Sequence, residues 1–167
     1  MANLDDVRKH GIFFSFTTDP CLPETIELTM EVLAICQGLK IPMKILTKQT
    51  DWYHEWTFHN DLLALGYTIT GTEDGEGCSS VISRLEVIRD YHIKDGKTFL
   101  SIEPLLDIST ICNNLLYIIN EVDLLKIGLE SGKKYNQRIL YNFYEWVMKV
   151  ANNSYSNTKV YWKDTYL

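Results

Sequence analysis

Apolar and polar residues follow two different periodicities along this chain. Short apolar runs rich in β-branched and aromatic residues, each closed by polar residues, are typical of buried strands. Between them lie longer segments whose apolar residues recur every three or four positions, which predicts amphipathic helices. Strands are predicted at residues 12–17, 41–47, 67–70, 98–102, 124–127 and 159–162.

The predicted helices begin and end at residues that suit helix termini. Pro23 fits a first helical turn, and Gly38 fits the position just after the last turn of the same helix. The first half of residues 51–65 is crowded with aromatic side chains, and residues 61–65 are expected to be helical. The main helices are predicted over residues 23–37, from Ser79 or Ser80 to about residue 91, from Asp107 or Ser109 to about residue 120, and over about residues 135–151.

Strands that alternate with helices imply a parallel sheet, and right-handed crossovers then place the helices outside it. Five or six such units suit either a partial barrel or an open doubly wound sheet. In both folds, ligands bind beyond the carboxyl ends of the strands. No internal linker interrupts the 167 residues, so we expect a single domain over residues 1–167.

The net charge of −6 argues against a broad nucleic-acid-binding surface, because phosphate contacts need many lysine and arginine side chains. We therefore do not expect nucleic acid as a partner of this chain alone, although a local basic pocket is compatible with the charge. No apolar run approaches the roughly 20 residues that span a bilayer, so no membrane partner is expected. The start, MANLDDVRKHG, lacks the apolar stretch of a signal peptide, which predicts a cytoplasmic protein.

Polar residues gather where the predicted strands end. They are Thr17, Thr18, Asp19, Thr47, Lys48, Thr70, Thr72, Glu103, Glu130 and Ser131. Polar groups near the end of a buried strand need water, a protein partner or a ligand. A ligand mouth would bring them together, with Lys48 facing a carboxylate or phosphate. The alternative is that strand ends are polar because they emerge into solvent. Glu103 has apolar neighbours, so we expect it to be partly buried and to have a partner.

The sequence contains no metal-binding motif. The four cysteines are widely separated, without the close spacing that lets one loop hold a metal, and the histidines lack the spacing of a metal-binding helix. Cys36 and Cys112 are expected to act as small apolar residues of helices, whereas Cys21 follows a strand end, where a thiol could face a ligand. The loop GTEDGEG lacks the features of a phosphate-binding loop and is predicted to be a flexible acidic loop.

Several stretches of the chain resemble the radical S-adenosylmethionine superfamily. They are FFSFTTDPCLPETIEL, ILTK, FLSIEPLLD and LLKIGLESG, which occur in this order between residues 11 and 131. Within the superfamily, the chain resembles the spore photoproduct lyase-like group and its phage-borne relatives. The resemblance implies an α/β fold, a partial TIM-type (β/α) barrel of about five to six parallel strands with outer helices.

The resemblance also implies that S-adenosylmethionine binds at the mouth of the barrel beside a 4Fe–4S iron–sulfur cluster. In the family, reductive cleavage of S-adenosylmethionine gives a radical that abstracts hydrogen from the substrate. Lys48 resembles a residue that contacts the methionine carboxylate, and Thr70 resembles a polar position that faces the same ligand. The candidate cofactor-binding residues are Thr17, Asp19, Lys48 and Thr70, and the candidate substrate-side residues are Glu103, Glu130 and Ser131.

One departure from the family pattern concerns its chemistry. Family members carry CxxxCxxC after the first barrel strand, and this chain has no such motif. Its first strand matches the family's second strand, and Phe16 stands where the lyase has its hydrogen-donor cysteine. We therefore expect a small-molecule ligand but no activity from the chain alone. A cluster is expected only if a missing amino-terminal segment supplies the cysteines.

Two non-catalytic interpretations stay open. The barrel mouth could bind a nucleoside or another small molecule without performing chemistry. Alternatively, the domain could serve assembly, because a barrel without its first strand exposes a sheet edge that tends to pair with another chain. The partner would then be a second copy, giving a homo-oligomer, or the missing amino-terminal segment.

Overall fold

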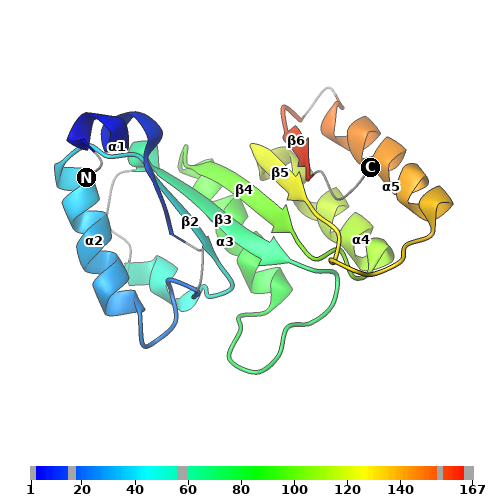
Figure 1. Cartoon of the computed structure of the whole chain (residues 1–167), viewed down its shortest axis with the longest axis horizontal. Helices are drawn as coiled ribbons and strands as arrows, with labels where there is room; N and C mark the ends of the chain where they lie inside the picture. The colour runs from blue at the N-terminus through cyan, green and yellow to red at the C-terminus, as the bar shows by residue number, and fades with distance from the viewer. Residues whose placement is uncertain (1–2, 15–17, 56–59, 154–155, 164–167) are drawn as a thin grey trace.

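A sheet of six parallel strands forms the centre of the computed structural model, which describes residues 3–14, 18–55, 60–153 and 156–163 (Figure 1). The strands lie in chain order, so each pairs with the strands before and after it. This order is typical of β/α barrels, whereas the order reverses in a doubly wound sheet. The strands are β1 (Ile12–Phe14), β2 (Met43–Thr47), β3 (Leu63–Ile69), β4 (Lys97–Ile102), β5 (Leu124–Ile127) and β6 (Lys159–Trp162).

Helices flank the sheet and leave one of its faces open. Figure 1 shows α3 and α4 behind the sheet, with α2 and α5 at its two ends. The α-helices are α1 (Leu4–His10), α2 (Ile26–Gly38), α3 (Val81–Ile93), α4 (Ile108–Ile118) and α5 (Gln137–Ala151). Short 3-10 helices are η1 (Asp51–Glu55), η2 (Asn60–Leu62) and η3 (Ile119–Glu121). In the described part of the chain, no helix has the length and apolar character that crossing a membrane requires.

The predicted partial barrel is confirmed. All six strands are parallel, helices cover one side, and the first and last described strands do not pair with each other, so the barrel is not closed. The strands predicted at residues 124–127 and 159–162 have those bounds. Residues 15–17 of the first predicted strand lie outside the described residues.

The helix expected at residues 61–65 is wrong, because β3 already begins at Leu63. Leu63 pairs with Met43 of β2, and Ala64 pairs with Lys97 of β4. Leu63 and Leu65 bury their side chains on the same face, as alternate strand residues do. Pairing on both edges together with burial outweighs the helical preference of leucine and alanine.

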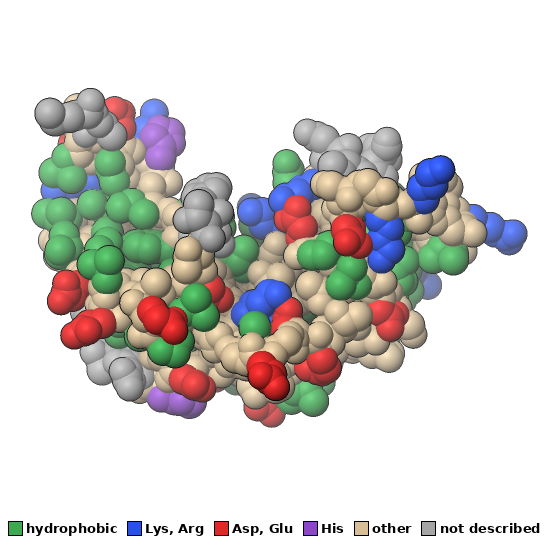
Figure 2. Space-filling model, turned by 60° about the horizontal axis from the view of Figure 1, so that its bottom comes forward, with side chains coloured by type: hydrophobic (Ala, Val, Ile, Leu, Met, Phe, Trp, Pro, Cys, Tyr) green, Lys and Arg blue, Asp and Glu red, His purple; other side chains and the backbone are tan. Residues whose placement is uncertain are grey.

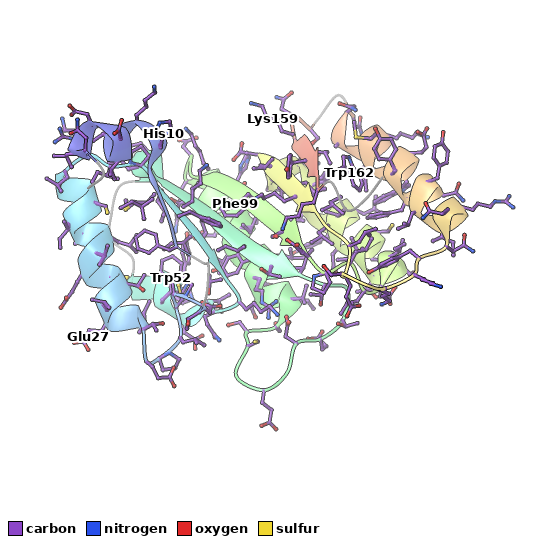
Figure 3. All side chains as sticks on the ribbon, in the orientation of Figure 1. His10, Glu27, Trp52, Phe99, Lys159 and Trp162 are labelled. Atoms are coloured by element: carbon purple, nitrogen blue, oxygen red, sulfur yellow. The ribbon has the colours of Figure 1, made fainter. Side chains whose placement is uncertain are left out.

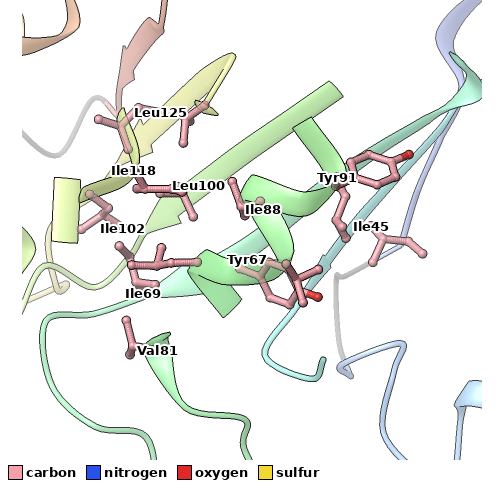
Figure 4. Packing of buried hydrophobic residues seen from close by; sticks show 14 of the residues in the cluster. Ile45, Tyr67, Ile69, Val81, Ile88, Tyr91, Leu100, Ile102, Ile118 and Leu125 are labelled. Carbon is pink, nitrogen blue, oxygen red and sulfur yellow. The ribbon is translucent and has the colours of Figure 1, made fainter. Parts of the chain in front are cut away.

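The outer face of the sheet and the inner sides of the helices form one apolar core. Leu65 and Leu100, from the two central strands, are completely buried. Figure 4 shows Ile88 of α3 lying over Tyr67 and Leu100 of the strands beneath it. The core therefore lies between the sheet and the helices, and the opposite face of the sheet contributes little to it.

Capping side chains determine where two of the helices begin. The Ser80 hydroxyl accepts a hydrogen bond from a backbone N–H of the first turn of α3, and the Asp107 carboxylate does the same for α4. Ser80 and Asp107 are thus the caps, rather than Ser79 and Ser109. Such caps stabilise a helix because they satisfy backbone donors that have no partner within it.

The orientation of α3 can be tested by replacing two isoleucines of this helix, one buried and one exposed, with alanine. We expect Ile88→Ala to lower the free energy of unfolding by about 2–5 kcal/mol, because it opens a cavity at a completely buried position. Ile82→Ala should change it by no more than about 0.5 kcal/mol, because Ile82 is 67% exposed. Urea unfolding followed by circular dichroism measures both. Similar losses in the two variants would contradict this orientation of α3.

Candidate functional site

Polar side chains at the carboxyl ends of the strands form two groups. The first joins the ends of β2 and β3, and the second joins the ends of β4 and β6. Figure 2, which turns this edge toward the viewer, shows acidic and basic side chains around a hollow between the two sides of the molecule. The first group consists of Asp19, Lys48, Asp74 and Arg84, and the second of Glu103 and Lys163.

Asp19 ties the loop after β1 to the end of β2. One carboxylate oxygen accepts the Thr47 hydroxyl at 2.6 Å and the Cys21 backbone N–H at 2.9 Å. The other accepts the Lys48 backbone N–H at 2.7 Å. Both oxygens of this predicted cofactor-binding residue therefore already have protein donors. Its predicted neighbour Thr17 lies outside the described residues.

Arg84 of α3 is completely buried and holds the first group together. Its guanidinium donates to the carbonyl oxygens of Lys48, Thr68 and Ser79 at 3.2, 2.8 and 2.6 Å. It also donates to the Asp74 carboxylate at 2.6 Å. A buried guanidinium requires such partners, so these bonds fix the ends of β2 and β3 and the loop that follows β3.

Asp74 lies between two cations. Its carboxylate forms ion pairs with the Arg84 guanidinium and with the Lys48 ammonium, and its side chain is only 9% exposed. Burial alone would raise the pKa of Asp74, but hydrogen bonds from Lys48 and Arg84 outweigh burial and hold this pKa below its ordinary value. Lys48 is therefore paired with Asp74, while a third of its side chain stays exposed.

Glu103 and Lys163 form the second group. The Lys163 ammonium forms an ion pair with the Glu103 carboxylate, and both side chains are about a third exposed. Gly128, after β5, lies beneath them: a Cβ there would lie 3.1 Å from the Glu103 carboxyl carbon and 3.1 Å from Cδ of Lys163. The expectation that Glu103 is partly buried and has a partner is confirmed. The missing side chain of Gly128 makes room for the pair.

The remaining predicted residues are spread along the same edge. Thr70 is buried, and its carbonyl oxygen accepts the Leu106 backbone N–H at 2.9 Å. Glu130 and Ser131 are exposed, and the Glu130 carboxylate lies 3.4 Å from the Lys133 ammonium. Glu130 is thus not joined to Glu103 by any contact between the described residues.

Arg84, Asp74 and Lys163 were not among the predicted site residues, although each position carries a signal. Arg84 lies three residues after Val81 and four before Ile88, on the buried side of α3, where a charged residue requires partners. Asp74 belongs to the loop predicted only to be acidic and flexible, and Lys163 directly follows β6. Lys163 occupies the same kind of strand-end position as the predicted residues.

The described cysteines do not fit an iron–sulfur cluster. Cys21 and Cys36 are buried, Cys112 is half-buried, and Cys78 is exposed. Burial raises the pKa of the Cys21 thiol to about 12, so this thiol stays protonated, whereas metals bind the thiolate. In residues 3–14, 18–55, 60–153 and 156–163, no three His, Cys, Asp or Glu side chains are placed to hold a metal together. Cys36 and Cys112 are small apolar residues of α2 and α4, as predicted.

Comparison with solved structures identifies the fold. No protein-family model matches the chain, and no curated protein sequence matches it significantly. SuiB of Streptococcus suis bound to S-adenosylmethionine superposes with a TM-score of 0.60 at 15% identity, covering 81% of this chain and 36% of SuiB. Spore photoproduct lyase complexed with dinucleoside spore photoproduct superposes with a TM-score of 0.61 at 13% identity, covering 96% of this chain and 67% of the lyase.

A further structure, SuiB bound to the precursor peptide SuiA, gives a TM-score of 0.59 at 15% identity over 80% of this chain. The chain spans about a third of the length of SuiB. SuiB and spore photoproduct lyase are radical S-adenosylmethionine enzymes. The chain therefore shares its fold with radical S-adenosylmethionine enzymes, spore photoproduct lyase among them.

The buried charges can be tested through the pH dependence of stability. We expect Asp74→Asn to lower the free energy of unfolding by roughly 3–5 kcal/mol at neutral pH, because it leaves the buried Arg84 without a counter-charge. The folded-state pKa of Asp74 is depressed, so its contribution is complete above the unfolded pKa of about 3.9 and is lost as the pH falls through the folded value. Urea unfolding between neutral and acidic pH measures the difference.

Glu73→Gln is the matched control, because Glu73 is an exposed carboxylate in the same loop. It should leave the free energy of unfolding within about 0.5 kcal/mol of the wild-type value. If the difference between wild type and Asp74→Asn stayed constant into the acid range, the ionised carboxylate would not be its cause.

Proposed function

We propose, on the basis of the radical S-adenosylmethionine fold, that this chain is a barrel domain of the spore photoproduct lyase-like kind that binds S-adenosylmethionine at the carboxyl edge of its sheet. A structural neighbour, SuiB, is bound to S-adenosylmethionine, and it shares the fold over 81% of this chain. The observation that carries the proposal is Lys48. Its ammonium lies at the end of β2, partly exposed, in an ion pair that can be exchanged.

The exchange is feasible because Asp74 has two cationic partners. When a ligand carboxylate takes the Lys48 ammonium, Asp74 keeps its bond to Arg84, so no buried carboxylate is left without a counter-charge. Lys48 therefore can contact the methionine carboxylate without breaking the buried network. In this proposal Thr70, at the end of the neighbouring strand, faces the same ligand.

The other half of the edge suits the substrate side. Glu103 and Lys163 present opposite charges side by side above Gly128. The Glu103 carboxylate can accept a hydrogen bond from a substrate, and the Lys163 ammonium can donate one to it. Glu130 and Ser131 are exposed nearby along the chain. Asp19, whose two oxygens are already bonded, contributes by holding the Lys48 backbone in place.

Isothermal titration calorimetry with S-adenosylmethionine tests the binding step. We expect wild-type chain to bind, and Lys48→Met to weaken binding by at least about tenfold, because it removes a charge-assisted hydrogen bond. Lys149→Met, which removes an exposed lysine of α5, is the control and should bind as wild type does. Absence of heat from the wild-type chain, with circular dichroism showing it folded, would overturn the proposal.

We further propose that the chain alone generates no radical, because its described residues do not supply the ligands of the cluster. Anaerobic reconstitution with iron and sulfide should give no cluster absorbance. A supplied amino-terminal segment carrying CxxxCxxC should pair with the open edge of β1, raise the mass seen by light scattering, and give a brown, iron-containing complex.

This experiment separates the catalytic interpretation from the two alternatives. A mixture that binds S-adenosylmethionine but never forms a cluster would favour a non-catalytic small-molecule or nucleoside-binding module. An assembly role would be favoured if the chain formed homo-oligomers through its sheet edge and did not bind the amino-terminal segment. Cluster formation on the chain by itself would contradict the proposal directly.

A further inference from the structure

The open face of the sheet carries four lysines, of which Lys44, Lys97 and Lys159 lie near the amino ends of their strands and Lys126 lies further along β5. Lys44 of β2 and Lys97 of β4 both lie in register with Ala64 of β3, which stands between them. Lys159 of β6 pairs with Leu124, and Lys126 lies two residues further along β5. Because residues two apart on a strand share a face, and paired residues of neighbouring strands do too, these lysines point to one side of the sheet.

A hollow separates these lysines. It has a volume of about 510 Å³ and lies on the open face of the sheet. From β3 only the small side chain of Ala64 lines it, and the Phe99 ring covers Gly66, where a Cβ would lie 2.3 Å from that ring. In Figure 3, the labelled Phe99 and Lys159 lie on this face, toward the amino ends of the strands. The residues around the hollow include Phe13, Lys44, Lys97, Phe99, Lys126 and Lys159.

The lysines of the hollow have no ion-pair partner in the part of the chain that the structure describes. No carboxylate of a described residue forms an ion pair with Lys44, Lys97, Lys126 or Lys159. Of the described residues that line the hollow, Asp123 is the one carboxylate, and it already accepts the backbone N–H of Thr98 at 2.7 Å.

Lys126 shows how poorly the positive charge is compensated. Burial, followed by the charges of Lys163 and Lys44, lowers the pKa of Lys126, and the charge of Glu103 offsets this effect only in part. Its ammonium lies 5.5 Å from the centre of the Phe13 ring, which belongs to the first strand of the sheet. The side chain from β5 thus reaches across the hollow toward the face of an aromatic ring.

We propose that this hollow binds a small, multiply phosphorylated anion. Phosphate groups are the anions that several convergent lysines recognise best, because each ammonium offers up to three donors and a full charge. The volume lies within the range of roughly 300–1,000 Å³ that small-molecule sites occupy. A nucleoside polyphosphate and an inorganic polyphosphate share this chemistry, and the Phe13 ring favours a ligand with an aromatic base.

An extended nucleic acid fits less well. Its phosphates would have to follow the outer surface, where a chain of net charge −6 repels them. The lysines instead gather inside one hollow, which suits a compact ligand. Lys44, Lys97 and Lys159 lie toward the opposite ends of the strands from Lys48 and Glu103. Lys126 lies further along its strand and also feels the charges of Lys163 and Glu103. The inference does not depend on the function proposed above, because it rests on these four lysines and not on Lys48.

Calorimetry with the whole chain tests this inference. Adenosine triphosphate and inorganic tripolyphosphate should both bind, and adenosine should not, because the phosphates supply the attraction. Tighter binding of adenosine triphosphate than of tripolyphosphate would identify the nucleotide as the source, and the reverse order would identify the inorganic anion. Added salt should weaken binding of both, because it screens the charges.

Variants locate the site. We expect the double change Lys44→Met and Lys97→Met to weaken adenosine triphosphate binding by more than about tenfold, because two charged donors are lost. Lys149→Met is the matched control and should bind as wild type does. Glu103→Gln, in contrast to the lysine changes, should not weaken phosphate binding, because it removes a negative charge that acts on Lys126.

Lys126→Met distinguishes a ligand-binding role of Lys126 from a structural one, because the two roles predict different changes in the thermal midpoint. Removing a poorly compensated cation should leave the thermal midpoint of the free chain unchanged or raise it, while weakening adenosine triphosphate binding by about tenfold. A bound anion should raise the midpoint of the wild-type chain more than that of this variant.

Three outcomes would overturn the inference. The first is that neither phosphate compound produces heat or raises the midpoint. The second is binding that survives the lysine changes. The third is that a single-stranded oligonucleotide or an acidic peptide binds more tightly than either phosphate compound, which would identify a macromolecular partner. None of these results bears on S-adenosylmethionine binding, which Lys48→Met tests separately.

Discussion

The structure depends on one constraint, the alternation of side chains along strands that all run in the same direction. Side chains such as Leu65 and Leu100 point to the outer face and are buried under helices. Their neighbours point to the inner face, which no helix covers in Figure 1. In a closed barrel, side chains from opposite strands fill this interior. Here the first and last described strands do not meet, so the inner face stays open to ligands.

The carboxyl edge of this open sheet is held in place by a buried charge in addition to apolar packing. Arg84 binds backbone carbonyls at the ends of two strands, so the loops there cannot shift without leaving a guanidinium unsatisfied. Asp19 adds a second restraint through the backbone of Lys48. The consequence is a rigid edge from which one cation, the Lys48 ammonium, is partly exposed and able to exchange partners.

The fold could be predicted because its signals are local. Apolar periodicity, the caps Ser80 and Asp107, and the regular alternation of strands and helices all lie within a few residues of the elements they determine. The prediction of a helix at residues 61–65 was wrong because the start of β3 at Leu63 depends on pairing with strands on both sides, which no local pattern encodes.

The candidate site could be predicted only in part. Lys48 and Asp19 were correctly placed at one edge, but the contact joins the carboxylate of Asp19 to the backbone of Lys48 and not to its ammonium. The partner of Glu103 is Lys163, 60 residues further along the chain. Such contacts follow from the curvature of the sheet, and so does the hollow beneath Lys126.

S-adenosylmethionine carries a net positive charge, whereas phosphates are anions. At the carboxyl edge each acidic side chain of the two groups already has a bonded partner, so under our proposals the cofactor binds there through the exchange of the Lys48 ion pair. The lysines of the hollow have no ion-pair partner among the described residues, so they repel the cofactor and attract phosphate.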